Sequence, residues 1–399
     1  MPDSSKDSGP DGVLPVVVIG AGPTGLACAS ALGRRGIPAV VLEQGNGVGG
    51  AWRSRYSGLQ LNSGRRFSGL PGLAIPRSAG TFPGRDDVVA YLEAYRAATG
   101  LDVRTGVRAL RVEQDRGRWR VVTDAGDWIT GEVVVATGLL ARGVVPPEWG
   151  AGDSGIRCLH SAEYVDAAPF AGADVLVAGA GSSGFEIAHD LAHSGVRSVR
   201  LSVRTPPNIL PRSVAGMSGD PVIALLRRLP PRVADVAVRP LRRLVIGDLS
   251  AVGLPMPTEG PFTRLSRPHD AGPAVVDREV VDDLRSGRIR VVPAVERFLQ
   301  DRVCLADGTG LRVDVVVAAT GLRPALEPLV GHLGVLDAAG LPAAEDETPA
   351  LPGLRFVNFG MRPLLLAAAG PRARRTATAI AREYRQRDDE EPARWLRAG

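Results

Sequence analysis

The sequence has few cysteines and no close pair of them. Cys28, Cys158 and Cys304 are widely separated in a chain of 399 residues, and no CxxC or CxxxxC segment occurs. A disulfide reductase needs such a pair to pass electrons on, so that class is disfavoured. We interpret the three thiols as reduced and mainly structural. No clustered Cys/His set with metal-ligand spacing is evident, and we predict no metal site.

Lysine is almost absent, since Lys6 is the only one, and the net charge of +5 comes from arginine. Arginine pairs such as 65–66, 227–228 and 242–243 are dispersed and lack the interleaved aromatic residues of a single-strand binder. We predict no nucleic-acid partner and interpret these arginines as solvated surface, with a few contacts to cofactor phosphates.

Long hydrophobic runs are missing as well. No apolar segment reaches the length of a membrane helix, and the polar N-terminus has no hydrophobic signal region. We expect a cytoplasmic protein without a membrane partner, disordered over residues 1–13. A chain of 399 residues exceeds a usual single core, so two domains are the default.

What the sequence does have is a dinucleotide-binding pattern near its start. The apolar segment 16–19 runs into GAGPTG at 20–25, an Ala/Leu-rich helix and a second strand that ends on Glu43. Gly20 permits the tight turn, Gly22 lets the backbone approach a pyrophosphate, and Gly25 lets helix and strand pack closely. Glu43 stands where an acid accepts hydrogen bonds from a ribose. A purely structural turn is the alternative, which the combination disfavours.

The same pattern returns at residue 174, after a period of about 160 residues. A strand at 175–178 leads into GAGSSG at 179–184, a helix over 185–193 and a strand over 199–203. This second strand is followed by Arg204-Thr205 in place of an acid, and an arginine there accommodates a 2′-phosphate. We therefore predict two nucleotides and favour NADPH over NADH; the alternative is that Arg204 is a surface cation.

These units predict an α/β fold of two Rossmann-like domains, the second inserted into the first. The segments 132–138 and 314–324 both lead a strand into Ala-Thr-Gly, and they resemble paired crossings between the domains. The predicted boundaries are 14–149 and 322–399 for the first domain and 150–321 for the second. A helical insert at about 212–260 is amphipathic, which favours packing on the protein over lying on a membrane. Further predicted elements are strands at 102–110, 119–123, 128–135, 289–292, 311–318 and 354–359, and a helix at 88–98 capped by Asp86-Asp87.

GAGPTG, VGGAWR (48–53), GAGSSG and the two Ala-Thr-Gly segments together resemble the class B flavin monooxygenases, specifically the flavin-containing monooxygenases with two dinucleotide-binding domains. The middle third, including VRTPPNILPR (203–212), is most similar to the plant YUCCA-type members and their bacterial relatives. The resemblance extends from residue 13 to about residue 383 and implies FAD in the first unit and NADPH in the second.

That resemblance implies an NADPH-consuming monooxygenase that acts with O2 on a small organic substrate through a C4a-(hydro)peroxyflavin. N- or S-oxygenation, and oxidation or oxidative decarboxylation of a carbonyl or 2-oxo acid, all stay open. So do an NADPH:acceptor reductase or oxidase and a non-catalytic nucleotide-binding protein. Arg65 and Arg66 are interpreted either as partners of a substrate carboxylate or as solvated surface, and the sequence leaves the oligomeric state undetermined.

The resemblance also implies roles for single residues. Asn62 would be catalytic, because an amide near the reactive edge of the flavin can hydrogen-bond a peroxide. Trp52 would lie by the flavin, or be a core aromatic, and Val107 would contact the adenine through its backbone. The residues implied to bind a cofactor are Gly20, Gly22, Pro23, Thr24, Gly25, Glu43, Gln44, Gly50, Trp52, Arg53, Asn62, Val107, Ala136, Thr137, Gly138, Gly179, Gly181, Ser182, Ser183, Gly184, Arg204, Thr205, Thr320, Gly321 and Gly360.

One family motif is degenerate. The fingerprint FxGxxxHxxx(F/Y) survives only from His160 to Tyr164, because Ser154 and Ile156 occupy its Phe and Gly positions. The Trp-Pro ending of the Baeyer–Villiger branch is missing, which argues against that branch. His160 is interpreted either as orienting the linker between the domains or as a structural histidine.

We predict that Asn62→Ala keeps NADPH oxidation but diverts the electrons to hydrogen peroxide, because the hydrogen bond that tunes the peroxide would be lost. The measurement compares NADPH consumed, hydrogen peroxide released and product formed. Unchanged coupling would remove Asn62 from the catalytic role.

Overall fold

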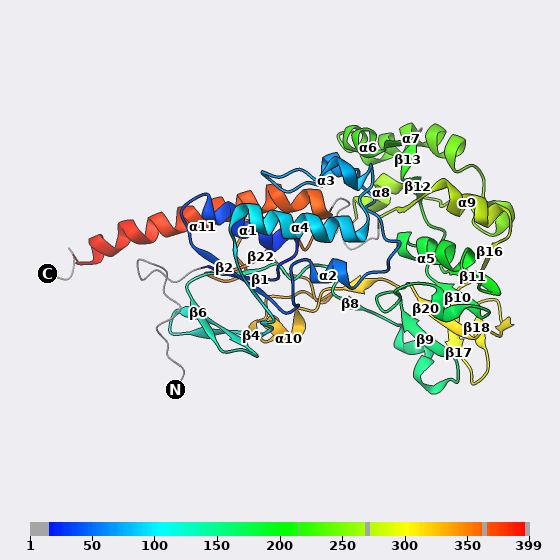
Figure 1. Ribbon diagram of the computed structural model, residues 1–399, viewed down its shortest axis with the longest axis horizontal. Coiled ribbons are helices and arrows are strands. Elements are labelled where there is room, and N and C mark those ends of the chain that lie inside the picture. Colours follow the sequence, from blue (N-terminus) through cyan, green and yellow to red (C-terminus); the bar gives the residue numbers. More distant parts are fainter. Residues whose placement is uncertain (1–15, 215, 268–271, 361–364, 396–399) are drawn as a thin grey trace.

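The computed structural model describes residues 16–214, 216–267, 272–360 and 365–395, so the predicted disordered segment 1–13 lies outside the described residues. Figure 1 shows two α/β units, with the C-terminal helix α11 (Leu365–Trp395) extending from the first of them. Among the described residues, no helix is both long and apolar enough to cross a membrane.

A five-stranded parallel sheet forms the first unit, in the order β22-β7-β1-β2-β3. Successive side chains of its strands point to opposite faces of the sheet, so alternate residues pack in two separate cores. The helices on one face and the antiparallel strands β4-β5-β6 with α10 on the other supply the rest of these cores. The elements are β1 (Val16–Ile19), β2 (Ala39–Glu43), β3 (Asp102–Thr105), β7 (Val133–Val135), β22 (Leu354–Phe356), α1 (Pro23–Gly33), α4 (Arg85–Thr99), β4 (Ala109–Asp115), β5 (Arg118–Thr123), β6 (Trp128–Thr130) and α10 (Glu327–Val330).

The second unit repeats this plan with the parallel order β16-β11-β10-β20-β9. Helices α5 and α9 pack on one face, and the antiparallel strands β17-β18-β19 pack on the other. The elements are β9 (Arg157–His160), β10 (Asp174–Ala178), β11 (Ser198–Val203), β16 (Ile289–Pro293), β20 (Val315–Ala318), α5 (Ser182–Ala192), α9 (Arg278–Arg285), β17 (Val295–Phe298), β18 (Val303–Leu305) and β19 (Gly310–Leu311).

The chain passes from the first unit to the second and later returns, and the two crossing segments lie side by side. β8 (Arg142–Gly143) pairs antiparallel with β21 (Leu322–Arg323), and the Thr320 hydroxyl donates to Val144 O. All strands of the second sheet lie between β7 and β22 in the sequence. The predicted α/β fold with one dinucleotide-binding unit inserted into the other is thereby confirmed, while the boundary residues themselves stay a prediction.

Three predicted strands were too long, because each spans a change of sheet. Segment 102–110 breaks at Gly106, which has φ +70°, segment 128–135 divides between β6 and β7, and segment 311–318 divides between β19 and β20. The predicted cap was wrong as well: Gly84 is the N-cap of α4, and Asp87 Oδ2 in the first turn accepts its N–H at 3.0 Å.

The helical insert packs on the protein as predicted. Its α6 (Asp220–Leu226) and α7 (Pro231–Val245) share a small core with Leu210 and with Phe262 of α8 (Pro261–Leu265). The outer face of α7 exposes Val233, Val236 and Leu244. The insert begins with the short strands β13 (Ser213–Val214) and β14 (Met217–Ser218) rather than with a helix.

His160 lies where the chain crosses between the units. It ends β9 at 3% exposure, its Nε2–H donates to Gly321 O at 3.0 Å, and its Nδ1 accepts the Ala162 N–H at 3.0 Å. A Cβ on Gly143 would lie 2.1 Å from Nδ1, so the imidazole occupies the space that the glycine leaves. These contacts support the interpretation that His160 orients the linker.

The environment of His160 predicts how the stability depends on pH. Burial lowers its pKa below the ordinary value, although the Gly321 carbonyl and Glu163 raise it, and Arg55 lowers it further. The unfolded chain therefore binds more protons, and the free energy of unfolding falls as the pH drops below about 6.5. Urea unfolding at about pH 8 and about pH 5.5 measures this loss.

In the variant His160→Gln the loss should be smaller, because glutamine does not titrate and can still donate to Gly321 O. The control His332→Gln changes a histidine outside this crossing and should keep the wild-type dependence. An unchanged dependence in His160→Gln would contradict the assignment.

Candidate functional site

Each glycine-rich turn connects the central strand of its sheet to the following helix. Gly20 after β1 has φ +104°, and Gly179 after β10 has φ +123°, values that residues with side chains rarely adopt. The N-caps of α1 and α5 are Gly22 and Gly181. Both turns lie at the carboxyl end of a central parallel strand, which is where open α/β sheets bind ligands.

The third glycine of each turn allows the helix to approach the strand. A Cβ on Gly25 would lie 1.9 Å from Gly20 O, and a Cβ on Gly184 would lie 1.9 Å from Gly179 O. No pair of nonbonded atoms tolerates that separation. Any side chain at Gly25 or Gly184 would therefore push its helix away from the turn.

The second glycine of each turn faces open space. A Cβ on Gly22 or Gly181 would meet no atom within 4 Å, and both residues have extended backbones that alanine can adopt. The protein's own atoms therefore do not require glycine at these two positions. The helix behind each opening presents N–H groups and the positive end of its dipole. The two turns therefore fit a pyrophosphate group each.

Each turn also rests on one of the Ala-Thr-Gly segments. A Cβ on Gly20 would lie 2.8 Å from Ala136 O, and one on Gly179 would lie 2.3 Å from Ala319 O. The Thr137 hydroxyl is buried without a hydrogen-bond partner among the described residues. A polar ligand at the first turn would give that hydroxyl a partner, which agrees with the predicted contact.

Glu43 connects the end of β2 to the first turn. Its Oε2 accepts the Ala21 N–H at 2.9 Å, its Oε1 accepts the Gly45 N–H at 2.9 Å, and the residue is 7% exposed. Each carboxylate oxygen can accept a second hydrogen bond, so the same group can still hold a ribose. Val107 donates its N–H to Glu43 O at 2.9 Å, which places its backbone beside this site.

The helix α2 (Gly50–Arg53) covers the same corner. A Cβ on Gly50 would lie 3.2 Å from Glu43 Oε1, so the carboxylate fills that space. Trp52 is half-buried and packs against the first core, as expected of a core aromatic. Arg53 pairs with Glu93 at 2.6 Å, so its charge is already compensated, and its contact to a cofactor stays a prediction.

The segment after β22 closes over the start of α1. Asn358 Nδ2–H donates to the Thr24 hydroxyl at 3.0 Å, and Gly360 N–H donates to Glu345 Oε2 at 2.9 Å. Thr24 therefore fixes protein structure in addition to any contact with a cofactor. Pro23 is the first residue of α1, Gln44 is exposed, and a Cβ on Gly138 would be in open space.

The second turn is tied to the chain beyond the insert. The Ser182 hydroxyl accepts the Val275 N–H of β15 (Ala274–Val276) at 2.9 Å, and Ser183 beside it is half-buried. Arg204 and Thr205 follow β11 and are exposed, and Arg204 forms no ion pair with any described residue. Its guanidinium is therefore available to a phosphate.

Asn62 lies exposed in the loop before α3 (Arg65–Ser68), and its side chain makes no hydrogen bond with the part of the chain that the structure describes. The loop around it is fixed from both sides. Leu61 N–H donates to Pro83 O at 2.9 Å, and Gly64 N–H donates to Asp220 Oδ2 at 2.6 Å. The backbone on both sides of Asn62 is thus held in place, and the amide is available to a ligand.

A buried charged cluster that sequence reasoning missed joins this loop to the second unit. Arg212 is 3% exposed and pairs with Glu186 of α5, while its Nη1–H donates to Gln60 Oε1 at 2.9 Å. The Tyr56 hydroxyl donates to the other oxygen of Glu186. Burial raises the pKa of Glu186, and the guanidinium opposes that shift. These residues come from three distant segments, so no spacing in the sequence indicates the cluster.

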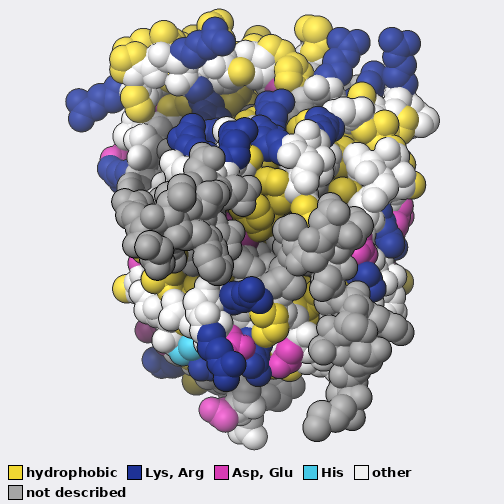
Figure 2. Space-filling model, turned by 90° about the vertical axis from the view of Figure 1, so that its left-hand side faces the viewer, with side chains coloured by type: hydrophobic (Ala, Val, Ile, Leu, Met, Phe, Trp, Pro, Cys, Tyr) yellow, Lys and Arg dark blue, Asp and Glu magenta, His cyan; other side chains and the backbone are white. Residues whose placement is uncertain are grey.

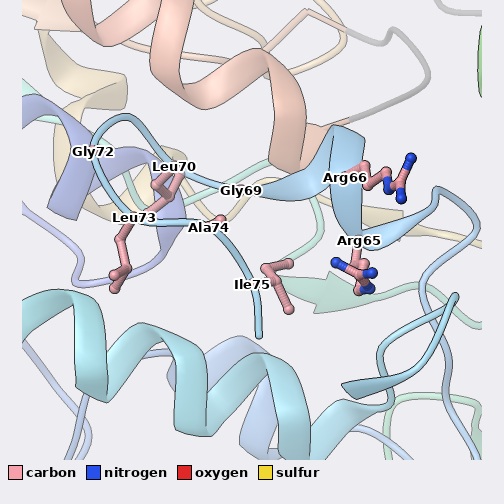
Figure 3. A pocket seen from close by; sticks show the side chains of 8 residues that line it. All are labelled: Arg65, Arg66, Gly69, Leu70, Gly72, Leu73, Ala74 and Ile75. Atoms are coloured by element: carbon pink, nitrogen blue, oxygen red, sulfur yellow. The ribbon is translucent and has the colours of Figure 1, made fainter. Parts of the chain in front are cut away.

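A cavity of ≈460 Å³ lies beside α3. Its lining is Arg65, Arg66, Gly69, Leu70, Gly72, Leu73, Ala74 and Ile75. Figure 3 shows both arginines at one end, and the loop with Leu70 and Leu73 curving around the other. Neither arginine forms an ion pair with a described residue. Figure 2 shows arginine side chains gathered with hydrophobic ones on the upper part of the molecule, at the height of α3, α6 and α7 in Figure 1.

Comparison with known proteins identifies the family. A model of the pyridine nucleotide-disulphide oxidoreductases matches residues 17–210. Indole-3-pyruvate monooxygenase YUCCA1 of Oryza sativa subsp. japonica is 35% identical over 380 residues, which are 93% of this chain and 92% of that protein. The chain belongs to the class B flavin-dependent monooxygenases. It is a flavin-dependent oxidoreductase of the monooxygenase type.

Two further comparisons agree with this membership. Probable indole-3-pyruvate monooxygenase YUCCA3 of Arabidopsis thaliana is 32% identical over 77% of this chain and 72% of that protein. The flavin-containing monooxygenase from Stenotrophomonas maltophilia superposes with a TM-score of 0.71 at 27% identity, over 93% of this chain and 98% of that one. The resemblance drawn from the motifs is confirmed. All three cysteines are unpaired, so the match to the disulphide oxidoreductases reflects shared nucleotide-binding units.

The two open glycines predict separate cofactor defects. Gly22→Ala should fold normally but lose FAD, because its Cβ takes the space of the first pyrophosphate. Gly181→Ala should keep FAD and raise the KM for NADPH by about tenfold or more. FAD content by absorbance, circular dichroism and NADPH kinetics measure these outcomes.

Variants of two further glycines serve as controls for this test. Gly25→Ala should destabilise the fold by at least about 2 kcal/mol, because its Cβ meets Gly20 O. Gly33→Ala, where a Cβ meets no atom within 4 Å, should leave both FAD content and stability unchanged. A Gly22→Ala protein with full FAD content would contradict the placement of the pyrophosphate.

Proposed function

We propose that this monooxygenase acts on a 2-oxo acid with an apolar or aromatic side chain, of the indole-3-pyruvate type, and converts it to the carboxylic acid that is one carbon shorter. The observation that carries the proposal is the pair of arginines, Arg65 and Arg66, which stand at one end of the cavity and form no ion pair with a described residue. The curated relatives act on indole-3-pyruvate by name.

The cavity suits such a molecule at both ends. A guanidinium without an ion-pair partner is a strong hydrogen-bond donor to a carboxylate. Leu70 and Leu73 line the other end and Ile75 lies between the two ends, and these residues suit an apolar side chain. A neutral amine or sulfide would leave both arginines without a partner.

Asn62 would serve the oxidation step from the same segment of chain. It stands three residues before Arg65, the first residue of α3, so a substrate held by Arg65 would lie near its amide. The Gly64 bond to Asp220 and the Arg212–Glu186 cluster hold this loop against the second unit. We infer that these contacts keep substrate, amide and both nucleotide turns in a fixed arrangement.

We assign the cofactors to the two turns. Gly20, Gly22, Gly25 and Glu43 would hold FAD, and Gly179, Gly181, Gly184 and Arg204 would hold NADPH, with the guanidinium of Arg204 on the 2′-phosphate. Bound there, the flavin would accept a hydride from NADPH and activate O2. The chain itself positions the groups, donates hydrogen bonds and excludes water.

The overall reaction is balanced as follows. One 2-oxo acid, one O2, one NADPH and one proton give the shortened carboxylic acid, CO2, NADP⁺ and water. The bond between the keto carbon and the carboxylate breaks, one oxygen atom enters the product, and the other leaves as water. Labelled O2 should therefore place one labelled atom in the product acid.

The test compares indole-3-pyruvate and phenylpyruvate with an aryl ketone, an amine and a sulfide. Arg65→Gln and Arg66→Gln should raise the KM for the 2-oxo acids by about tenfold, the value of a charge-assisted hydrogen bond. Turnover of the uncharged ketone should change little. The control Arg77→Gln removes an exposed arginine of the same segment that does not line the cavity.

Two outcomes would overturn parts of the proposal. Labelled oxygen in an amine or sulfide product, with no conversion of 2-oxo acids, would reject the substrate class. NADPH oxidation that yields only hydrogen peroxide with every compound would favour an oxidase.

A further inference from the structure

The second unit contains a cluster of two histidines and an aspartate that the cofactor sites do not use. His189 lies in the C-terminal part of α5, and His193, four residues on, is the C-cap of that helix, so both lie on one side of its end. Asp283 of α9 faces them. One ligand atom from each of the three residues lies within 4.8 Å of the others.

We propose that His189, His193 and Asp283 form a binding site for a divalent transition-metal ion, with Zn²⁺ as the occupant, which joins α5 to α9. Imidazole nitrogen and carboxylate oxygen are ligands that Zn²⁺ accepts at about 2.0–2.2 Å in a tetrahedral arrangement. Three protein ligands leave the fourth position to water. The sequence prediction of no metal site considered clustered Cys/His motifs and overlooked this pair of histidines.

The distances between the three ligand atoms suit such an ion. His189 Nδ1 lies 2.6 Å from Asp283 Oδ2, and His193 Nε2 lies 3.0 Å from the same oxygen. Ligand atoms around a tetrahedral zinc lie roughly 3.3 Å apart, so small side-chain rotations are sufficient. His189 and His193 are 34% and 45% exposed, which gives an ion access from solvent, while Asp283 is 4% exposed.

The backbones that carry the ligands are held by the core. Ile187, Ala188 and Leu191 of α5 pack in the same cluster as Val280, Val281 and Leu284 of α9. The three ligands therefore project from two helices whose spacing is fixed without a metal. A preorganised set of this kind costs little to arrange when the ion binds.

Without an ion, one contact in the cluster is unfavourable. Arg288 Nη1 lies 3.0 Å from Asp283 Oδ1 and 3.2 Å from His193 Nε2, while that Nε2 is 3.0 Å from both oxygens of Asp283. Nε2 cannot donate to the carboxylate and accept from the guanidinium at the same time. A bound ion resolves the conflict, because Nε2 then donates its lone pair to the metal and the 52% exposed Arg288 moves into solvent.

The position of the cluster, away from the second turn, would give the ion a structural role. Along α5, His189 and His193 are roughly 12–18 Å from Gly181 at about 1.5 Å per residue. The ion would therefore not touch a nucleotide at the second turn. It would hold the far end of α5 against α9, two helices that lie side by side in Figure 1.

The test uses the full FAD-loaded chain, free of any affinity tag and treated with a chelator. Isothermal titration with Zn²⁺ should show one tight site per chain, and Mg²⁺, which prefers oxygen ligands, should not compete. His193→Gln should weaken this site by about tenfold or more, and Arg288→Ala should strengthen it. His332→Gln, outside the cluster, should bind as the wild type does.

The alternative is a His–Asp–Arg hydrogen-bond network without a metal. It predicts that Arg288→Ala lowers the melting temperature and gains no Zn²⁺ affinity, and that His193→Gln binds Zn²⁺ as well as the wild type. Either result would overturn the proposal. His193 is half-exposed, so His193→Gln is expected to fold, and its FAD content confirms folding before each titration.

Discussion

The fold depends on one close approach that occurs twice: the helix after each central strand begins almost in contact with the turn that precedes it. Gly25 approaches Gly20 O, and Gly184 approaches Gly179 O, so closely that a Cβ would lie at 1.9 Å. This approach brings the N-termini of α1 and α5 over the ends of β1 and β10. Both dinucleotide sites follow from it, because the helix dipole and the free N–H groups then face the opening at Gly22 and Gly181.

The second constraint is the connection between the two units. Antiparallel pairing of β8 with β21 brings both crossings together, and His160 fills the space left by Gly143 and hydrogen-bonds to Gly321. A second contact between the units is the buried Arg212–Glu186 pair. Together with Tyr56 and Gln60, it holds the loop of Asn62 against α5. A buried pair of this kind stabilises little by itself but costs much if one member is lost. It therefore fixes one arrangement of loop and helix.

These constraints serve the oxygenation reaction by fixing position. The family membership supplies flavin-dependent monooxygenation, while the proposed substrate class rests on Arg65, Arg66 and the apolar cavity wall. The His189–His193–Asp283 cluster lies outside this machinery, at the far end of the helix whose N-terminus forms the second turn. If it holds an ion, the second unit is stabilised at a place where no cofactor contributes.

The sequence by itself determined the two nucleotide turns, the inserted order of the units and the family, because these depend on local patterns: strand, glycine spacing, helix and the residue after the second strand. It placed Asn62 in a loop and identified Arg204 by its position after the second strand of its unit, where the first unit has Glu43. Only the tertiary structure decided which residues from distant segments meet. Examples are Arg212 with Glu186 and Tyr56, His160 with Gly143 and Gly321, and Asp283 with His189 and His193. The physical reason is that such contacts depend on how sheets and helices pack, so no spacing along the chain encodes them. The broken strands at Gly106 and between β6 and β7 have the same origin, since an apolar run does not show at which residue the chain changes sheet.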